Sequence, residues 1–380
     1  MGRVPVLAAA SFATSTQSFV YAGLLNEMSH DLGVAVAQVG QLGTAFALAY
    51  GLSAIPLAAL CARVPRRRLM VGALSAMALL NLGMALAPSF GALLLLRVLC
   101  GMAAALIVPS ASAVAVVLAP PEKRARALAL VIGGTTAAFL LGIPLGSVAG
   151  ATFGWHGAFG LTTVLCAASA LAIRMALPEV PGEGRGGASL GVLPAIGLAY
   201  FCFTSSFATS AYIGPAVNAV SGLSGGGVGL MQALSGVASI FGLPLGTRMY
   251  EKAGVHTVWL VPAAIVAAQA LQASLLLGFL QGSMLAIAAQ GLALLVSSMA
   301  IFAMMPVVQS RLIALAPDAR GVVLAANASG VYLGQASGAA AGGIAIAVAG
   351  LPGISIAGTL IACCALLLAF QVRRGARAGA

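Results

Sequence analysis

Long apolar stretches, separated by short polar segments, recur along the whole of this 380-residue chain. Many reach about 18 residues or more, the length with which an α-helix crosses the hydrocarbon of a bilayer. They lack the short alternating period of a membrane β-barrel. The pattern predicts an all-α membrane protein with twelve transmembrane spans. We expect these at residues 5–24, 39–62, 69–87, 91–118, 127–151, 157–177, 190–212, 226–247, 256–280, 283–309, 321–347 and 351–371.

Composition supports this class and excludes a soluble domain. Hydrophobic residues make up 61% of the chain, charged residues only 7%, and the mean hydropathy is +1.09, whereas soluble domains carry about 25% charged residues. Apart from Arg97, the lysines and arginines fall in alternate loops and at the two termini. By the positive-inside rule this predicts a multi-pass protein with both termini in the cytoplasm. The net charge of +11 then faces an anionic leaflet, and we expect no nucleic-acid partner.

A polar segment at 178–189 divides the expected spans six and six. We therefore predict an N-terminal six-helix half at 1–177, a cytoplasmic linker at 178–189, and a C-terminal six-helix half at 190–380. Small residues at every fourth position form flat helix faces that neighbouring backbones can approach closely. Such rows occur in the fifth span of both halves, which argues for a duplicated unit. We expect these rows, together with Pro144, to allow close packing and bending of the helices and to let them rock against each other. The rows comprise Gly134, Ala138, Gly142, Gly146 and Gly150, and, in the second half, Gly330, Gly334, Gly338 and Gly342.

Local motifs make a family likeness specific. The segment "LLLLRVLCGMAAA" at 93–105 is similar to a fourth-helix signature, and "GIPLGSVAGATFGWHGAF" at 142–159 to a fifth-helix antiporter motif. "YLGQASGAAAGG" at 332–343 resembles the eleventh helix of the same group, and "YAGLLNEMSHDLGV" at 21–34 resembles the end of its first helix and the following loop. The chain thus resembles the major facilitator superfamily, in its drug:proton antiporter-1 branch near the sugar-efflux and chloramphenicol-efflux exporters. The resemblance implies two pseudo-symmetric six-helix halves and location in a bacterial inner membrane.

Two positions depart from the pattern of that branch. The loop after the second span reads "ALCARVPRRR", with Ala62 in place of an aspartate and Pro65 in place of a glycine. Its basic cluster, Arg63, Arg66 and Arg67, survives as a candidate for conformational control, but the acidic partner is missing. Gln17 stands where the family usually has a first-helix glutamate that is tied to proton coupling.

Apart from Arg174, which flanks the central loop at the end of the sixth span, Arg97 is the charged residue that falls inside an expected span. All seven acidic residues fall in or beside loops. A charge within a bilayer is costly and marks a functional site or a polar pair. Arg97 and Gln17 lie six or seven residues from the outer ends of their spans, so we expect them at one depth and hypothesise that the Gln17 side chain accepts a hydrogen bond from Arg97. The alternative is structural: Arg97 caps carbonyls between helices and Gln17 binds neighbouring helices together.

Other polar-tipped residues in the first, seventh and eleventh spans are candidate substrate contacts, and each could equally be an interhelical hydrogen-bonding residue. They are Tyr21, Tyr200, Asn327, Tyr332 and Gln335. Nucleotide-binding loops, paired catalytic carboxylates and metal-ligand spacings are absent from the sequence. We therefore expect no cofactor and no enzyme activity.

The sequence predicts a monomeric secondary transporter whose partners are a small-molecule substrate, the lipid bilayer and protons as coupling ion. From the resemblance we expect export of a sugar-like or drug-like solute by alternating access with proton antiport. Because no carboxylate is expected within the membrane, the alternative is an uncoupled facilitator or a substrate/substrate exchanger, with an anionic solute as its candidate substrate. A transporter-shaped receptor or lipid-handling protein is a third class.

Overall fold

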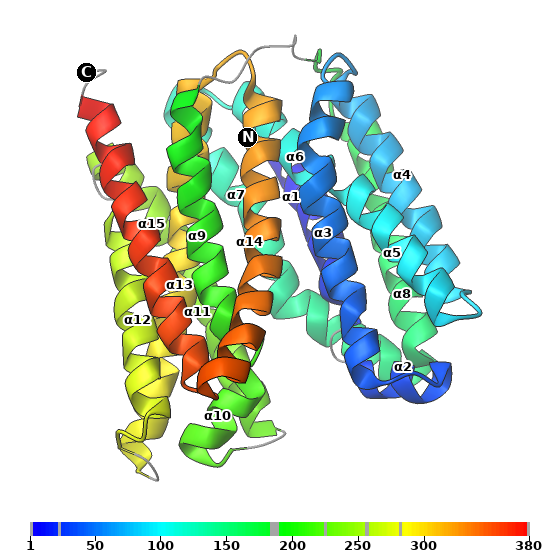
Figure 1. Cartoon of the computed structure of the whole chain (residues 1–380). Coiled ribbons are helices and arrows are strands. Elements are labelled where there is room, and N and C mark those ends of the chain that lie inside the picture. The colour runs from blue at the N-terminus through cyan, green and yellow to red at the C-terminus, as the bar shows by residue number, and fades with distance from the viewer. Residues whose placement is uncertain are drawn as a thin grey trace. The chain divides into compact units, whose positions relative to one another are not determined.

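The computed structural model describes residues 3–21, 24–182, 190–223, 226–254, 258–280 and 283–377, and within them the regular elements are helices. Figure 1 shows long helices running side by side within each part of the chain. The elements are α1 (Val4–Phe19), α2 (Leu25–Leu32), α3 (Val36–Leu60), α4 (Arg66–Ala85), α5 (Phe90–Ala104), α6 (Ile107–Leu118), η1 (Pro121–Lys123), α7 (Arg124–Ala137), η2 (Ala138–Gly142), α8 (Ile143–Ala176), η3 (Leu190–Val192), α9 (Leu193–Ser210), α10 (Ile213–Ser221), α11 (Gly226–Ala253), α12 (Leu260–Leu276), α13 (Met284–Leu315), α14 (Arg320–Ala349) and α15 (Gly353–Arg377).

The helical, membrane-spanning character expected from the hydropathy pattern is confirmed. Among the described residues, 8 helices are long and apolar enough to cross a membrane, or 9 if one bent pair forms a single span. Each of the expected ranges overlaps helix, but the count of twelve stays a prediction. Apolar side chains remain exposed along the helix faces, for example Leu79 at 70% and Leu360 at 65%, as lipid-facing surfaces require.

Two expected spans are interrupted near one end. The range 5–24 contains a helix that stops at Phe19, before α2 starts at Leu25. The range 190–212 contains α9, which ends at Ser210 and is followed by α10 at an angle of 55°. The hydropathy pattern missed both breaks because the apolar character continues across them. Discontinuous helices in corresponding positions of two repeats are a feature of transporter binding sites.

The fifth and sixth expected spans are joined in one helical segment. Between α7 and α8 the backbone forms a π-helical turn at Ala138–Gly142, which ends two residues before Pro144. Proline has no N–H to donate, and this disturbs the regular helical hydrogen bonding. Within α8, Gly154 has φ 69° and ψ 174°, a conformation that favours glycine. This kink falls in the gap between the expected ranges 127–151 and 157–177.

The chain divides into two compact units, which we describe separately. The first unit comprises Met1–Ala188 and Ala316–Ser329, and the second comprises Ser189–Leu315 and Gly330–Ala380. Within the first unit, Ser329 of α14 donates a hydrogen bond to the main-chain oxygen of Gly51 in α3. The predicted halves at 1–177 and 190–380, joined by a linker at 178–189, stay a prediction.

The glycine row of the first unit lies directly against α1. A Cβ atom on Gly134 would overlap the main-chain oxygen of Ala8, and one on Gly146 would come within 2.6 Å of Val20 Cγ2. A Cβ on Gly142 would overlap the side chain of Thr16, and one on Gly150 would overlap that of Leu24. The contacted residues therefore lie four or eight residues apart along α1 and the segment that follows it, and the approach is too close for larger side chains.

The second unit repeats this arrangement with α14 and α9. A Cβ on Gly334 would lie 2.6 Å from the main-chain oxygen of Tyr200, and one on Gly330 would lie 3.1 Å from Ile196 Cγ2. A Cβ on Gly338 would come even closer to the main-chain oxygen of Thr204, and one on Gly342 to that of Ala208. Both units thus contain a glycine face packed on their first long helix. That these faces let the helices rock stays a prediction.

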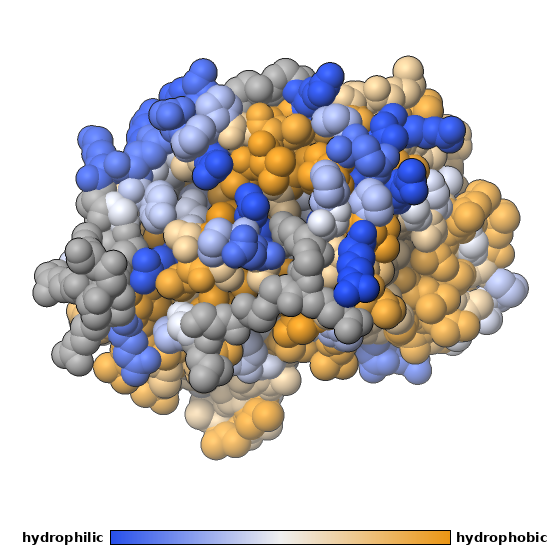
Figure 2. Space-filling view, turned by 90° about the horizontal axis from the view of Figure 1, so that it is seen from above, coloured by the Kyte–Doolittle hydropathy of each residue, from blue (hydrophilic) through white to orange (hydrophobic). Residues whose placement is uncertain are grey.

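Hydrophilic residues gather at the end of the helices where α3 ends and α4 begins, seen from above in Figure 2. The exposed residues there include Arg63 and Arg68, and Glu122, Lys123 and Arg124 beside α7. This end carries the cluster that the positive-inside rule assigns to the cytoplasm.

We predict that Gly338→Ala lowers the melting temperature of the detergent-purified protein, because the new methyl group would force α14 away from α9. Overpacking of this kind costs about 1–3 kcal/mol. The matched control is Gly236→Ala in α11, where a Cβ would meet nothing within 4 Å. Equal melting temperatures for the two variants would contradict the close packing of α14 on α9.

Candidate functional site

Arg97 lies on α5 with none of its surface exposed. Its guanidinium reaches the end of α1: Nη1 donates to the main-chain oxygen of Gln17 at 2.9 Å, and Nη2 to that of Ser18 at 2.7 Å. The last carbonyls of a helix have no donors within it, and they form the negative end of its dipole. Because α1 stops at Phe19, both oxygens are available to the buried charge.

Two aromatic rings also contact the guanidinium. Its Cζ lies 4.8 Å from the centroid of the Tyr21 ring and 5.0 Å from that of Phe46 on α3. Both distances are within the range of cation–π attraction, which strengthens where water is excluded. Tyr21 was expected at this site from the sequence. Phe46 was missed, because one phenylalanine on an apolar helix carries no signal that separates it from ordinary core residues.

The hypothesis that the Gln17 side chain accepts from Arg97 was wrong. The two residues do meet, as their shared depth predicted, but the acceptor is the main-chain oxygen of Gln17. The side-chain Oε1 and Nε2 of Gln17 are buried and have no hydrogen-bond partner among the described residues. Capping of helix carbonyls by Arg97, the structural alternative, is what the contacts show.

Within the described part of the chain, the ion pairs involve Glu179 and two arginines of the α3–α4 region, and none involves Arg97. The helix end and the aromatic faces take the place of a carboxylate. Such partners distribute the charge without a second ion, whose own burial would add a desolvation cost.

A hydrogen-bonded network supports α5 one turn beyond Arg97. The side-chain amide of Asn81 on α4 donates to the main-chain oxygen of Met77 at 2.7 Å and to Cys100 Sγ at 3.8 Å. Its Oδ1 accepts from the hydroxyl of Thr162 on α8 at 3.0 Å. Asn81 therefore links three helices of the first unit at the level of the site, a role that the sequence analysis did not assign.

The other predicted contacts are distributed along α9 and α14. Tyr200 donates its hydroxyl proton to Ser337 Oγ at 3.0 Å within the second unit. Tyr332 and Gln335 are half-buried on α14 of that unit. Asn327, at the start of α14, is 1% exposed, and its Oδ1 has no hydrogen-bond partner among the described residues. The tyrosine contact fits an interhelical hydrogen bond as well as it fits a substrate role.

Sequence reasoning also missed a polar node in the second unit. Gln269 of α12 accepts from Thr209 Oγ1 at 2.7 Å and donates to the main-chain oxygen of Ser205 at 3.1 Å. Ser205 in turn donates to the main-chain oxygen of Gly358 on α15 at 2.7 Å. These bonds join α9, α12 and α15 and leave the Gln269 amide satisfied, as a structural contact within a membrane requires.

Comparison with known proteins identifies the family. Residues 7–309 match the model of the Major Facilitator Superfamily. This chain belongs to the major facilitator superfamily. It is 28% identical over 386 residues to an uncharacterized MFS-type transporter, YbcL, of Bacillus subtilis (strain 168), an alignment that covers 97% of this chain and 96% of the relative.

The fold is also that of a solved superfamily member. The crystal structure of the human organic anion transporter MFSD10 (TETRAN) matches with a TM-score of 0.76 and 21% identity, over 97% of this chain and 99% of that chain. This likeness shows the fold alone. The superfamily resemblance, the all-α membrane class and the absence of enzyme activity are therefore confirmed, whereas the drug:proton antiporter-1 branch stays a prediction.

The arginine cluster between the end of α3 and the start of α4 does have an acidic partner, although Ala62 replaces the loop aspartate. Arg67 Nη2 lies 2.6 Å from Glu179 Oε2, and Arg67 Nη1 donates to the main-chain oxygen of Leu177 at 3.2 Å. The Arg66 main-chain N–H donates to the oxygen of Val180 at 2.9 Å. Residues 177–182, which follow α8, are thus docked on this region, and they supply the carboxylate that the sequence motif lacks.

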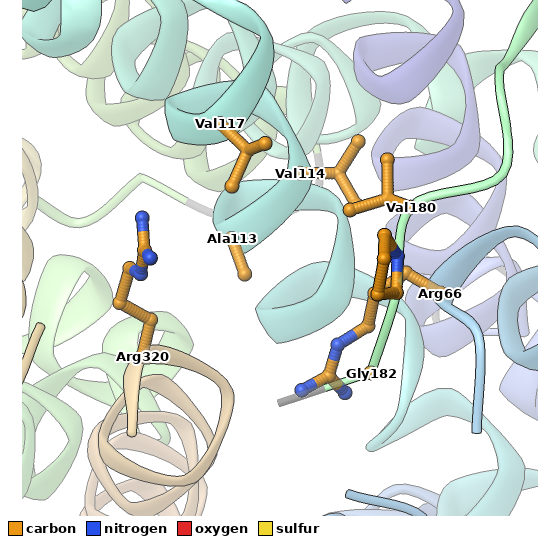
Figure 3. A pocket seen from close by; sticks show the side chains of 8 residues that line it. Arg66, Ala113, Val114, Val117, Val180, Gly182 and Arg320 are labelled. Carbon is orange, nitrogen blue, oxygen red and sulfur yellow. The ribbon is translucent and has the colours of Figure 1, made fainter. Parts of the chain in front are cut away.

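A pocket of about 230 Å³ opens beside this segment. Figure 3 shows the side chains of Arg66 and Arg320 on two sides of it, with apolar residues of α6 between them. None of its lining residues is among those that contact Arg97, so it is separate from the Arg97 site. The lining residues, all in the first unit, are Arg66, Ala113, Val114, Val117, Val180, Pro181, Gly182 and Arg320.

We predict that Arg97→Met and Arg97→Lys change the stability of the protein by different amounts. Methionine fills a similar volume without a charge, and replacement of a buried charge by a well-packed apolar group is often neutral for stability. Lysine keeps the charge but lacks the planar fork that bonds two carbonyls while lying between two rings. We expect a lower melting temperature for the lysine variant than for the methionine variant, measured in detergent. The reverse order would contradict the contacts assigned to the guanidinium.

Proposed function

We propose that this chain is a secondary transporter of a bacterial inner membrane that exports a small organic solute, sugar-like or drug-like, by alternating access with proton antiport. The superfamily consists of membrane transporters, and the motifs in the first, fourth, fifth and eleventh spans support the antiporter branch. The paired glycine faces in the two units suit helices that slide and rock against each other. The chain acts as a monomer with both termini in the cytoplasm.

The observation that carries the location of the solute site is the buried charge of Arg97. Burial of a guanidinium within a membrane span is costly, and residues that are kept there despite this cost commonly mark substrate or ion pathways. Arg97 is such a residue, fully buried at the end of a broken first helix. Tyr21 and Gln17 adjoin it within the first unit. Tyr200, Tyr332 and Gln335 of the second unit stay candidate contacts of their own.

The same observation favours a second candidate, an uncoupled facilitator or a substrate/substrate exchanger for an anionic solute. Arg97 has no carboxylate partner in the described part of the chain. The acidic residues that the structure describes lie in α2, η1, α11 and the segments after α8 and α13. A relay of membrane-embedded carboxylates, the usual proton path of transporters, has no candidate among them.

Transport by the purified protein in liposomes tests this proposal. We expect solute movement against its gradient when a pH gradient is the sole driving force, and none with Arg97→Met. Equilibration that ignores the pH gradient would instead support a facilitator, and stimulation by solute on the opposite side an exchanger. Failure of every solute to move, with lipid moving in its place, would overturn the proposal of a solute transporter.

We further predict that Gln17→Glu increases the dependence of transport on the pH gradient. The substitution places a titratable group on α1 at a residue whose own main-chain carbonyl accepts a hydrogen bond from Arg97. Solute fluxes at several imposed pH differences, compared between the variant and the wild type, measure this effect. Gln17→Met is the matched control, because it removes the amide without adding a titratable group. An unchanged pH dependence in the glutamate variant would show that α1 does not take part in coupling.

A further inference from the structure

The two aromatic rings define the directions from which a ligand can reach Arg97. The Tyr21 and Phe46 rings both lie within cation–π range of the guanidinium. The main-chain oxygens of Gln17 and Ser18 occupy one hydrogen on each terminal nitrogen. The positions that remain are N–H groups at the edge of the guanidinium plane, and Nε has no hydrogen-bond partner in the described structure.

Two glycines make room for these rings. A Cβ on Gly43 of α3 would overlap the Tyr21 hydroxyl and lie 3.0 Å from its Cζ. A Cβ on Gly101 of α5 would lie 2.6 Å from the main-chain oxygen of Phe46 and 3.2 Å from Ala49 Cβ. Gly43 therefore admits the Tyr21 ring, and Gly101 lets α3 approach α5 closely enough to place Phe46 against Arg97.

The site also contains polar groups whose hydrogen-bonding capacity is unused. Arg97 Nε and both side-chain atoms of Gln17 are buried without a partner among the described residues, and both residues are fully buried. Leaving such groups unpaired costs free energy, so their retention points to a ligand that pairs with them. A ligand for Arg97 Nε must be an acceptor, and the most favourable acceptor for the edge of a guanidinium is a planar oxyanion.

We propose that the Arg97 site selects solutes with a carboxylate group, which it binds edge-on in the guanidinium plane, and that Gly43 and Gly101 are positioning residues for this selectivity. This inference rests on the proposed transport function and names its substrate class. Phe46 and Tyr21 hold the guanidinium in one orientation and shield its faces. An uncharged carboxamide of the same shape offers Arg97 a neutral acceptor, whose hydrogen bonds to a guanidinium are weaker than those of a carboxylate.

Ligand binding to the full-length purified protein tests the substrate class independently of transport. The probes are aliphatic and aromatic monocarboxylates, each paired with its carboxamide, and the readout is the shift in melting temperature with probe concentration. We expect carboxylates to bind and their carboxamides to bind at least roughly tenfold more weakly, since hydrogen bonds to an ionised acceptor are about twice as strong as those to a neutral one. Failure of every carboxylate to bind, or equal binding by the carboxamides, would overturn the inference.

Variants test the positioning residues. Gly43→Ala and Gly101→Ala should weaken carboxylate binding roughly tenfold by displacing a ring from Arg97. The matched controls are Gly40→Ala on α3 and Gly91→Ala on α5, where a Cβ would meet nothing within 4 Å; both should bind as the wild type does. Phe46→Leu removes the ring while keeping an apolar side chain, and it serves if a glycine variant does not fold. Wild-type carboxylate selectivity in Phe46→Leu and both folded glycine variants would contradict the positioning role.

The two proposals fail in different ways. Carboxylate binding without movement of any solute in liposomes would remove the transport proposal and leave a carboxylate-binding site. Transport of neutral solutes by a protein that ignores carboxylates would keep the transport proposal and overturn the carboxylate site.

Discussion

The bond between Arg97 and the end of α1 is the constraint on which the candidate site depends. A buried guanidinium needs electron-rich partners, and here two main-chain oxygens provide them. Those oxygens are available because α1 stops at Phe19; in a helix continued to residue 24, the Gln17 oxygen would accept from the Tyr21 N–H instead. The break in the first helix and the burial of the charge therefore require each other.

Close helix packing follows from glycine at both the site and the repeats. Gly43 and Gly101 bring α3 against Tyr21 and α5, while the glycine rows bring α7 and α8 onto α1 and α14 onto α9. Between helices in a bilayer, van der Waals packing has to replace the hydrophobic effect as the attractive force. Small residues at these contacts therefore stabilise each unit and at the same time place the aromatic side chains around Arg97.

The predictability of this protein differs between fold and site. Hydropathy predicts the helices, and a four-residue glycine period predicts which faces pack, because both properties repeat along the sequence. The placement of Arg97 beside Gln17 followed from counting residues to the membrane surface. The acceptor atom did not, since it depends on where α1 breaks, and neither did Phe46 or Glu179. Those contacts join residues far apart in the chain, such as Arg67 and Glu179, and no local pattern marks them.

A carboxylate solute would also change what coupling means in this protein. An empty site carries the charge of Arg97, whereas a site loaded with a monoanion is neutral. Reorientation of the empty carrier would then move a positive charge across part of the membrane, against or with a potential worth about 2.3 kcal/mol per 100 mV for a full crossing, while the loaded carrier would be insensitive to it. Such an asymmetry makes net flux sensitive to the membrane potential and leaves exchange of one anion for another insensitive to it. It requires no carboxylate in the protein, because the solute itself supplies the counter-charge that the amide of Gln17 does not.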